Sequence, residues 1–173
     1  MHIDNNQIKF IKNQYGKPYL QGYTDFKFNI SHSGDFVVCA VDDKSIGVDI
    51  EEVKNIEYKE ISRNCFTENE FNYINQENSN IQLNRFYKIW TLKESYIKYC
   101  GQGLSMPLES FSIDIDKENI KVIVNEEYKE HTFKLFSIES NYKMAVCSLN
   151  KGISDNIIYI NQESLINNYT ILR

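Results

Sequence analysis

The sequence has little proline and glycine, few cysteines and no long apolar run. Two prolines and seven glycines in 173 residues exclude collagen-like and low-complexity chains. No apolar stretch approaches the roughly 20 residues of a membrane helix, and residues 1–5 lack the basic and apolar parts of a signal peptide. We therefore expect a soluble, cytoplasmic protein that does not bind a membrane.

The cysteines and the charge balance exclude further classes. Cys39, Cys65, Cys100 and Cys147 lie far apart with no CxxC pair. Neither a zinc cage nor a disulfide framework is predicted, and the thiols are expected to be reduced and mostly buried. With 19 basic against 24 acidic residues, the net charge of −5 disfavours a nucleic-acid partner. Any anionic ligand must be held by a local group of cations.

Apolar periodicity predicts an α+β protein. Strands are expected at 26–31, 36–41, 46–51, 111–115, 120–124, 132–138 and 143–149. The region from 58 to 99 is helical, with a capping box at Thr67 and Glu70, and its strongest helix runs from about 82 to a left-handed cap at Gly101. We expect the first three strands to form one small sheet and the last four a second. The predicted division places an N-terminal half at 1–100 and a C-terminal half at 101–173.

The strand at 46–51 carries two acids on one face. Asp49 and Glu51 alternate with apolar residues and share their face with Gly47. Two carboxylates beside open space suit Mg²⁺, which binds through one or two carboxylates together with phosphate oxygens and water. The alternative is an edge strand with a solvated acidic face.

The long helix carries a second group, in which Trp90, Glu94 and Lys98 follow one another at single-turn spacing. A glutamate four residues before a lysine is commonly a surface pair worth about 0.3–0.5 kcal/mol. Trp90, the only tryptophan, makes a fully solvated face less plausible, and a partly buried Glu and Lys then require a function.

The third group is the segment 29–34, at the end of a strand that turns at Gly34. Its hydroxyls, its imidazole and its backbone amides could hold phosphate oxygens. His32 could equally be a hydrogen-bonded structural histidine. No nucleophile elbow surrounds the serines, so covalent catalysis by them is not indicated.

Taken in chain order, these groups resemble the 4′-phosphopantetheinyl transferases of the surfactin-synthetase-activating type. The matching segments are 15–18, 29–33, 46–51, 90–98 and 101–104, and the order and spacing agree from about residue 8 to at least 149. The resemblance implies a pseudo-dimer of two similar α+β halves with the site between them. It also implies transfer of phosphopantetheine from coenzyme A to a serine of an acyl or peptidyl carrier protein, releasing adenosine 3′,5′-bisphosphate, in nonribosomal peptide or polyketide biosynthesis.

The resemblance also implies roles for individual residues. The implied Mg²⁺ ligands are Asp49, Glu51 and Glu94, and the implied catalytic residues are Glu94 and Lys98. The implied contacts of coenzyme A are Lys17, Pro18, Ser31, His32, Lys93 and Lys98. Glu94 is the best candidate base for the serine proton, directly or through a metal-bound water.

One departure from the family pattern and two alternative functions accompany this interpretation. Members of the type normally have a further strand and helix before the region that matches residues 8–17, so we expect an incomplete first half. An apolar face around Phe26, Phe28, Val37 and Val38 would then be exposed and would favour self-association. The alternative functions are a truncated or inactive module that binds coenzyme A or a carrier protein, and a Mg²⁺-dependent phosphohydrolase.

Overall fold

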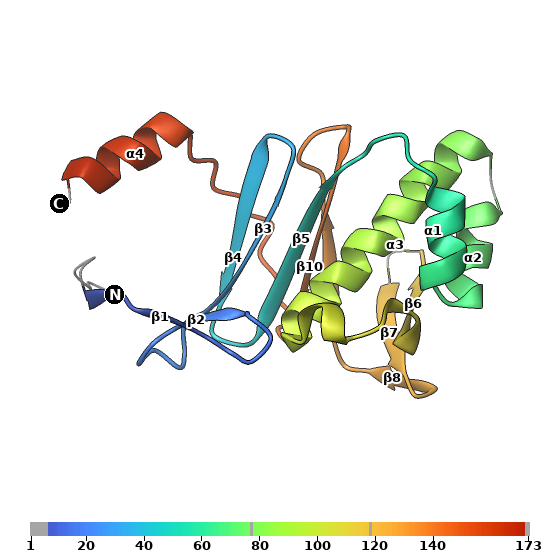
Figure 1. The fold of residues 1–173 in the computed structure, drawn as a ribbon, viewed down its shortest axis with the longest axis horizontal. Coiled ribbons are helices and arrows are strands. Elements are labelled where there is room, and N and C mark those ends of the chain that lie inside the picture. The colour runs from blue at the N-terminus through green and yellow to red at the C-terminus, as the bar shows by residue number, and fades with distance from the viewer. Residues whose placement is uncertain (1–6, 77, 118, 172–173) are drawn as a thin grey trace.

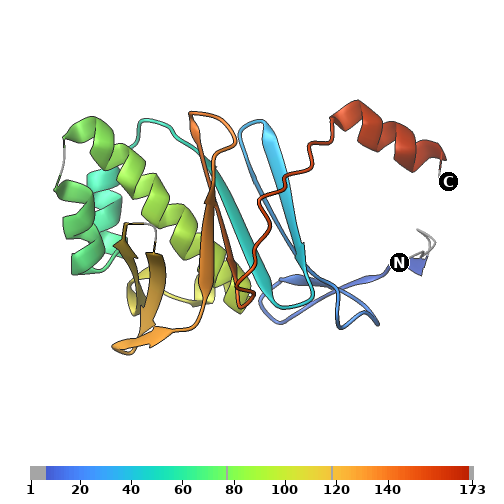
Figure 2. The same cartoon turned by 180° about the vertical axis from the view of Figure 1, so that it is seen from behind.

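The computed structural model describes residues 7–76, 78–117 and 119–171, and its class is α+β as predicted. Three layers carry the candidate site (Figure 1, and Figure 2 from behind). The middle layer is an antiparallel sheet in the order β5 (Ile46–Glu52), β10 (Tyr142–Ser148), β9 (Thr132–Phe136). A hairpin of β3 (Lys27–Ser33) and β4 (Phe36–Asp42) lies on one side, and helix α3 (Ser79–Cys100) on the other.

Smaller elements surround this centre. A β1–β2 ribbon, Phe10–Lys12 with Pro18–Leu20, lies below the hairpin, whereas α1 (Tyr58–Cys65) and α2 (Glu68–Asn75) lie beyond α3. A second sheet contains β6 (Phe111–Asp116), β7 (Asn119–Val124) and β8 (Glu127–Lys129). Short 3-10 turns occupy Gly103–Ser105 and Leu108–Ser110, and α4 (Gln162–Ile171) follows an extended stretch.

The sequence pattern missed β1, β2, β8 and α4. Among the described residues, no helix is long and apolar enough to cross a membrane.

The pairing of β5 corrects the predicted first sheet. Instead of joining β3 and β4 in one sheet, β5 pairs with β10 in register, with Asp49 opposite Ala145 and Glu51 opposite Lys143. Alternation of apolar residues identifies a strand but does not identify its partner. The predicted halves, 1–100 and 101–173, therefore share the central sheet.

One edge of β5 pairs with β10. Along the opposite edge, side chains of β3 accept hydrogen bonds from the backbone amides of β5. Three β5 amides donate hydrogen bonds to β3 side chains: Val48 to Asn29 at 2.8 Å, Ile50 to Ser31 at 3.4 Å and Glu52 to Ser33 at 3.0 Å. Buried backbone amides need such acceptors. Both strands have a period of two, so every second residue of β3 meets every second amide of β5. We call this set of three hydrogen bonds the side-chain ladder.

The two faces of β5 have different neighbours. Ile46, Val48 and Ile50 pack in a cluster with apolar residues of the hairpin. The opposite face meets α3 so closely that a Cβ on Gly47 would overlap the backbone of Ser95 and Tyr99. Because side chains alternate along a strand, Asp49 and Glu51 share the face of Gly47 and point toward α3.

The expected apolar surface is present in part. Val37 is 76% exposed, and Ile30 and Val41 on the same outer face of the hairpin are also exposed. Phe28, by contrast, is buried, because the ring of Phe10 packs edge-on against it at a centroid distance of 5.6 Å. The β1–β2 ribbon therefore covers one end of this face.

The four cysteines are free, as expected, but only Cys147 is fully buried, while Cys39 is exposed.

Candidate active site

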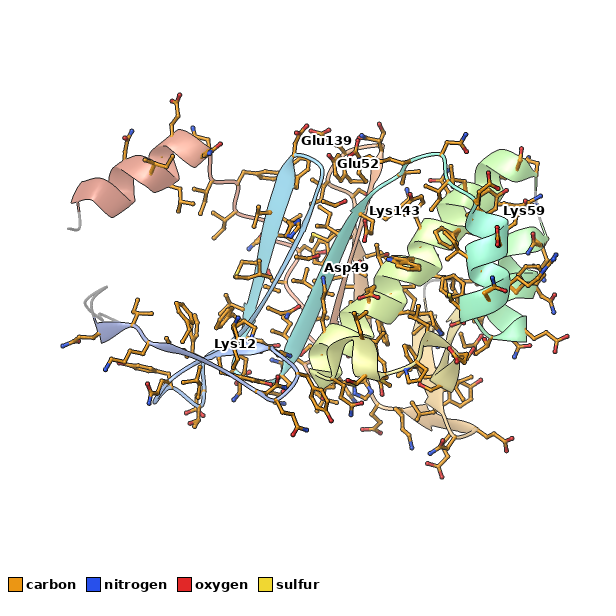
Figure 3. All side chains as sticks on the ribbon, viewed as in Figure 1. Lys12, Asp49, Glu52, Lys59, Glu139 and Lys143 are labelled. Carbon is orange, nitrogen blue, oxygen red and sulfur yellow. The ribbon has the colours of Figure 1, made fainter. Side chains whose placement is uncertain are left out.

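Four predicted residues meet between β5 and α3. Asp49 and Glu51 come from β5, and Glu94 and Lys98 come from one face of α3, one turn apart. Figure 3 labels Asp49 at the boundary between the strand and the helix. Gly47 permits the close approach that brings these two faces together.

Asp49 is the centre of the group. Its side chain is almost fully buried, and its Oδ1 accepts hydrogen bonds from Lys98 Nζ at 2.7 Å and Ser31 Oγ at 2.9 Å. Its Oδ2 is buried without a hydrogen-bond partner. Burial raises the pKa of Asp49, and the ammonium of Lys98 partly offsets that effect. A buried carboxylate oxygen without a donor is a position that a cation would satisfy.

Glu51 is half-buried one step further along the same face. Its Oε2 accepts a hydrogen bond from Ser33 Oγ at 3.1 Å. Burial and the negative charge of Asp49 raise the pKa of Glu51, and hydrogen bonds from Ser33 and Trp90 partly offset the increase. Trp90, the residue that made a solvated helix face less plausible, therefore does border the site.

Glu94 adds a third acidic side chain to Asp49 and Glu51. Burial raises its pKa, and the charges of Asp49 and Glu51 raise it further, while Lys98 acts in the opposite direction. Its carboxylate has no hydrogen-bond partner within the described part of the chain. Three carboxylates thus repel one another in a partly buried cluster that contains one lysine, and a bound cation would relieve this repulsion.

The donor set fits a hard cation that is shared with a ligand. In residues 7–76, 78–117 and 119–171 no group of three or more His, Cys, Asp or Glu side chains is arranged to hold a metal ion by itself. Mg²⁺ rarely occupies such an all-protein cage; it takes one or two carboxylates together with substrate phosphates and water. The unpartnered oxygen of Asp49 and the nearby acids agree with that mode of binding.

The side chain of Lys98 links the acids to β3. Its Nζ donates to Asp49 Oδ1 and, at 2.7 Å, to Ser31 Oγ. The side chain is 26% exposed, so a ligand can reach part of it from solution. Lys98 and Ser31 therefore lie where a phosphate bound beside Asp49 could meet them.

Lys93 requires a correction. We predicted a phosphate contact, but its side chain is fully buried on another face of α3. Its Nζ donates to Glu70 Oε1 at 2.6 Å and to the carbonyl of Phe111 at 2.7 Å. Glu70 also accepts from the amides of Thr67 and Ile113. This ion pair joins α2, α3 and β6, and no ligand can reach its ammonium in this arrangement.

The remaining predicted contacts lie outside the acid group. The ammonium of Lys17 donates to the carbonyls of Ile46, Lys98 and Tyr99 at 2.6 to 3.1 Å, and burial lowers its pKa to about 8. It thus holds the C-terminal end of α3, so a ligand at the turn would meet Pro18 or the backbone. His32 is exposed on the outer face of β3, opposite to Ser31. The structure therefore brings Ser31, but not His32, to the acids.

Sequence reasoning missed Asn29 and Ser33 as site residues. Both belong to the side-chain ladder, and Ser33 holds Glu51 as well. They lie in the segment 29–34, whose polar groups were predicted to hold phosphate oxygens and not the amides of another strand. The pairing of positions about 19 apart, Asn29 with Val48 and Ser33 with Glu52, becomes evident only from the fold.

Comparisons with known proteins agree on one family. The family model described as 4′-phosphopantetheinyl transferase superfamily matches residues 45–147. A model of the 4′-phosphopantetheinyl transferase N-terminal region matches residues 1–44, so the part that we expected to be incomplete carries this family's N-terminal sequence.

Individual relatives support the same grouping, and one solved structure has a similar fold. The chain is 35% identical over 165 residues to 4′-phosphopantetheinyl transferase Sfp of Bacillus subtilis (strain 168), covering 95% of this chain and 73% of that protein. It is 37% identical to 4′-phosphopantetheinyl transferase gsp of Aneurinibacillus migulanus, covering 90% of this chain and 64% of that protein. The holo-[acyl-carrier-protein] synthase of Thermotoga maritima has a similar fold, with a TM-score of 0.51 and 16% identity, covering 71% of this chain and 73% of that one.

The buried ion pair yields a stability prediction. Replacing Lys93 by Met leaves Glu70 buried without its cation, and breaking a buried pair in this way costs about 3–5 kcal/mol. We expect a loss of this size in the free energy of unfolding, measured by urea denaturation. Lys59→Met, on the exposed face of α1, is the matched control and should change stability by less than about 0.5 kcal/mol.

A second variant distinguishes a role of Lys93 in stability from a direct contact of Lys93 with coenzyme A. Lys93→Met combined with Glu70→Leu removes both charges and should recover much of the lost stability. This folded double variant should bind coenzyme A as the unmodified chain does. Weaker coenzyme binding by that variant would restore Lys93 as a phosphate contact.

Proposed function

Because this chain belongs to the 4′-phosphopantetheinyl transferase superfamily, we propose that it transfers the 4′-phosphopantetheine group from coenzyme A to a serine of an acyl or peptidyl carrier protein. Adenosine 3′,5′-bisphosphate is the second product. Nonribosomal peptide or polyketide biosynthesis is the expected setting. The observation that carries the proposal is the buried Asp49, which has an unpartnered Oδ2, is paired with Lys98 and interacts electrostatically with Glu51 and Glu94.

The chemistry explains this set of residues. The serine oxygen forms a bond to the phosphorus of the pantetheine phosphate, and the bond from that phosphorus to the bridging pyrophosphate oxygen breaks. The electron pair of the broken bond leaves with adenosine 3′,5′-bisphosphate, and the serine proton passes to a base. Both the attack on an anionic pyrophosphate and the departure of an anion require positive charge nearby.

We assign Asp49, Glu51 and Glu94 as the residues that hold Mg²⁺. When bound, this ion supplies positive charge to the pyrophosphate oxygens. Lys98 is already held beside the acids by Asp49 and Ser31. In the proposal its ammonium binds a phosphate oxygen, and Ser31 supports its orientation.

Glu94 is the proposed proton acceptor, acting directly or through a water molecule. Burial and the charge of Asp49 raise the pKa of Glu94, which makes the carboxylate a stronger base. Its lack of a hydrogen-bond partner in the described structure leaves the carboxylate available for this task.

The other predicted contacts remain proposals. The turn at Lys17 and Pro18 is expected at the nucleotide end of coenzyme A, and His32 is expected at a phosphate. Self-association through the exposed hairpin face and a cytoplasmic location also remain predictions. The molar mass in solution would test self-association.

A module that only binds coenzyme A or a carrier protein is disfavoured, because binding alone does not require three mutually repelling acids.

Intact mass spectrometry of a carrier protein tests the transfer. Incubation of an apo carrier protein with this chain, coenzyme A and Mg²⁺ should add one phosphopantetheine group to the carrier. Chelation of the metal with EDTA should abolish the mass increase, and added Mg²⁺ should restore it. An unchanged mass with several apo carriers, although coenzyme A binds, would favour the binding module instead.

Glu94→Gln tests the proposed base, because it keeps the size of the side chain and removes its charge. Turnover should fall by at least about 100-fold, the lower end of what a positioned acid or base contributes. Glu60→Gln, an equally conservative change on exposed α1, is the matched control and should leave turnover unchanged.

Asp49→Asn should produce a comparable loss and also weaken Mn²⁺ binding as measured by electron paramagnetic resonance. A loss of less than tenfold in Glu94→Gln, with the control unchanged, would remove Glu94 from the catalytic role.

A further inference from the structure

The hydroxyl of Ser33 joins the side-chain ladder to the acids. Ser33 ends β3, and its Oγ accepts a hydrogen bond from the amide of Glu52 at 3.0 Å. The same oxygen lies 3.1 Å from Oε2 of Glu51 and donates to it. An amide can only donate, so it takes a lone pair of the hydroxyl and leaves the single hydrogen for the carboxylate. The directions of both hydrogen bonds are therefore fixed.

The backbone of β5 sets the place of this hydroxyl. Glu52 follows Glu51 directly in the strand, so Ser33 is anchored one residue from the side chain that it contacts. The side chain of Glu52 belongs to the opposite face of β5 and pairs with Lys54 at 2.8 Å. The edge of a strand thus fixes the position of the donor that Glu51 meets.

Glu51 needs donors that hold its carboxylate. The side chain is half-buried, and the negative charge of Asp49 on the same face repels it. A glutamate turns about three side-chain bonds, so this repulsion favours orientations in which the carboxylate points away from Asp49. Hydrogen bonds from Ser33 on β3 and from Trp90 on α3 oppose that rotation. A carboxylate offers about four acceptor positions, so positions remain for a cation.

Ser33 has a simpler set of contacts than Ser31. The hydroxyl of Ser31 donates to an acid and also accepts a hydrogen bond from Lys98, so replacing Ser31 would disturb the ion pair as well. Within the described residues, the hydroxyl of Ser33 contacts only the Glu51 carboxylate and the next amide of β5. Because its hydrogen is already donated, this hydroxyl is suited to orienting an acid and not to binding a phosphate.

We propose that Ser33 is a positioning residue, which holds the Glu51 carboxylate in the orientation in which it binds the divalent cation. The inference rests on the proposed function, because it takes Glu51 as a ligand of that cation. Replacing a residue that orients a metal ligand by a hydrogen bond typically lowers metal affinity by about 10- to 100-fold. Ser33 acts through Glu51, so it affects the affinity for the metal and not the transfer step once the metal is bound.

Titration with Mn²⁺, followed by electron paramagnetic resonance, tests the proposal. Coenzyme A is present and carrier protein is omitted, so the result does not depend on turnover. Ser33→Ala should raise the Kd for Mn²⁺ by at least about tenfold. Ser33→Thr, which keeps the hydroxyl, should restore the Kd to within about threefold of the value for the unmodified chain. Thermal unfolding verifies that each variant folds, and Ser33→Cys, whose thiol is a weaker donor, replaces Ser33→Ala if that variant unfolds.

Asn29→Ala is the matched control. It removes another hydrogen bond of the side-chain ladder, the one from the amide of Val48, but Asn29 contacts no acid within the described residues. The Kd for Mn²⁺ should therefore change by less than about threefold, because Asn29 orients no proposed metal ligand. Equal losses of affinity in Asn29→Ala and Ser33→Ala would overturn the proposal, because damage to the ladder alone would then explain both.

Glu51→Gln separates this inference from the proposed function. It should weaken Mn²⁺ binding at least as much as Ser33→Ala does, and transfer by Ser33→Ala should return to nearly the unmodified rate at saturating Mg²⁺. Normal Mn²⁺ affinity in Ser33→Ala, with weak binding in Glu51→Gln, would overturn the positioning role and leave the proposed metal site intact. Normal Mn²⁺ affinity in Glu51→Gln would overturn Glu51 as a metal ligand, and this inference with it.

Discussion

One edge of β5 is completed by side chains instead of by a neighbouring strand. Asn29, Ser31 and Ser33 accept hydrogen bonds from alternate amides of β5, while β10 pairs with the opposite edge. This side-chain ladder satisfies buried amides that would otherwise destabilise the sheet. Because no described strand pairs with this edge, β3 lies close enough for its side chains to reach the carboxylates of β5. The positions of the acids in the site therefore depend on the ladder.

The same two hydroxyls that complete the sheet also orient the acids. Ser31 contacts Asp49 and Lys98, and Ser33 contacts Glu51. Each serine thus receives an amide hydrogen bond and donates its own hydrogen to a carboxylate. On the other side, the missing side chain of Gly47 lets α3 bring Glu94 and Lys98 against β5. The resulting cluster of negative charge is unfavourable alone, which is the property expected of a site that binds a cation together with an anionic ligand.

Most local structure could be predicted from the sequence, and most pairing could not. The periodicity that indicated β3, β4, β5 and α3 reflects local burial, and Gly101 ends α3 with a φ of 70° as its position suggested. The partner of β5 is β10, nearly 100 residues away, and no local pattern encodes that contact. Lys93 and Glu94 are adjacent in the sequence, but their environments differ: Lys93 forms a buried ion pair with Glu70, and Glu94 lies near the acids of β5. Adjacent residues of a helix differ by about 100° in direction, so a motif by itself does not show which of its members meets the ligand.

Amide hydrogen exchange measured by nuclear magnetic resonance tests the side-chain ladder most directly. We predict that the amides of Val48 and Glu52 exchange slowly although neither has a strand partner on that edge. In Ser33→Ala the amide of Glu52 should lose its protection, and the amide of Val48, which bonds to Asn29, should keep it. Rapid exchange of both amides in the unmodified chain, or unchanged protection of Glu52 in Ser33→Ala, would contradict the account.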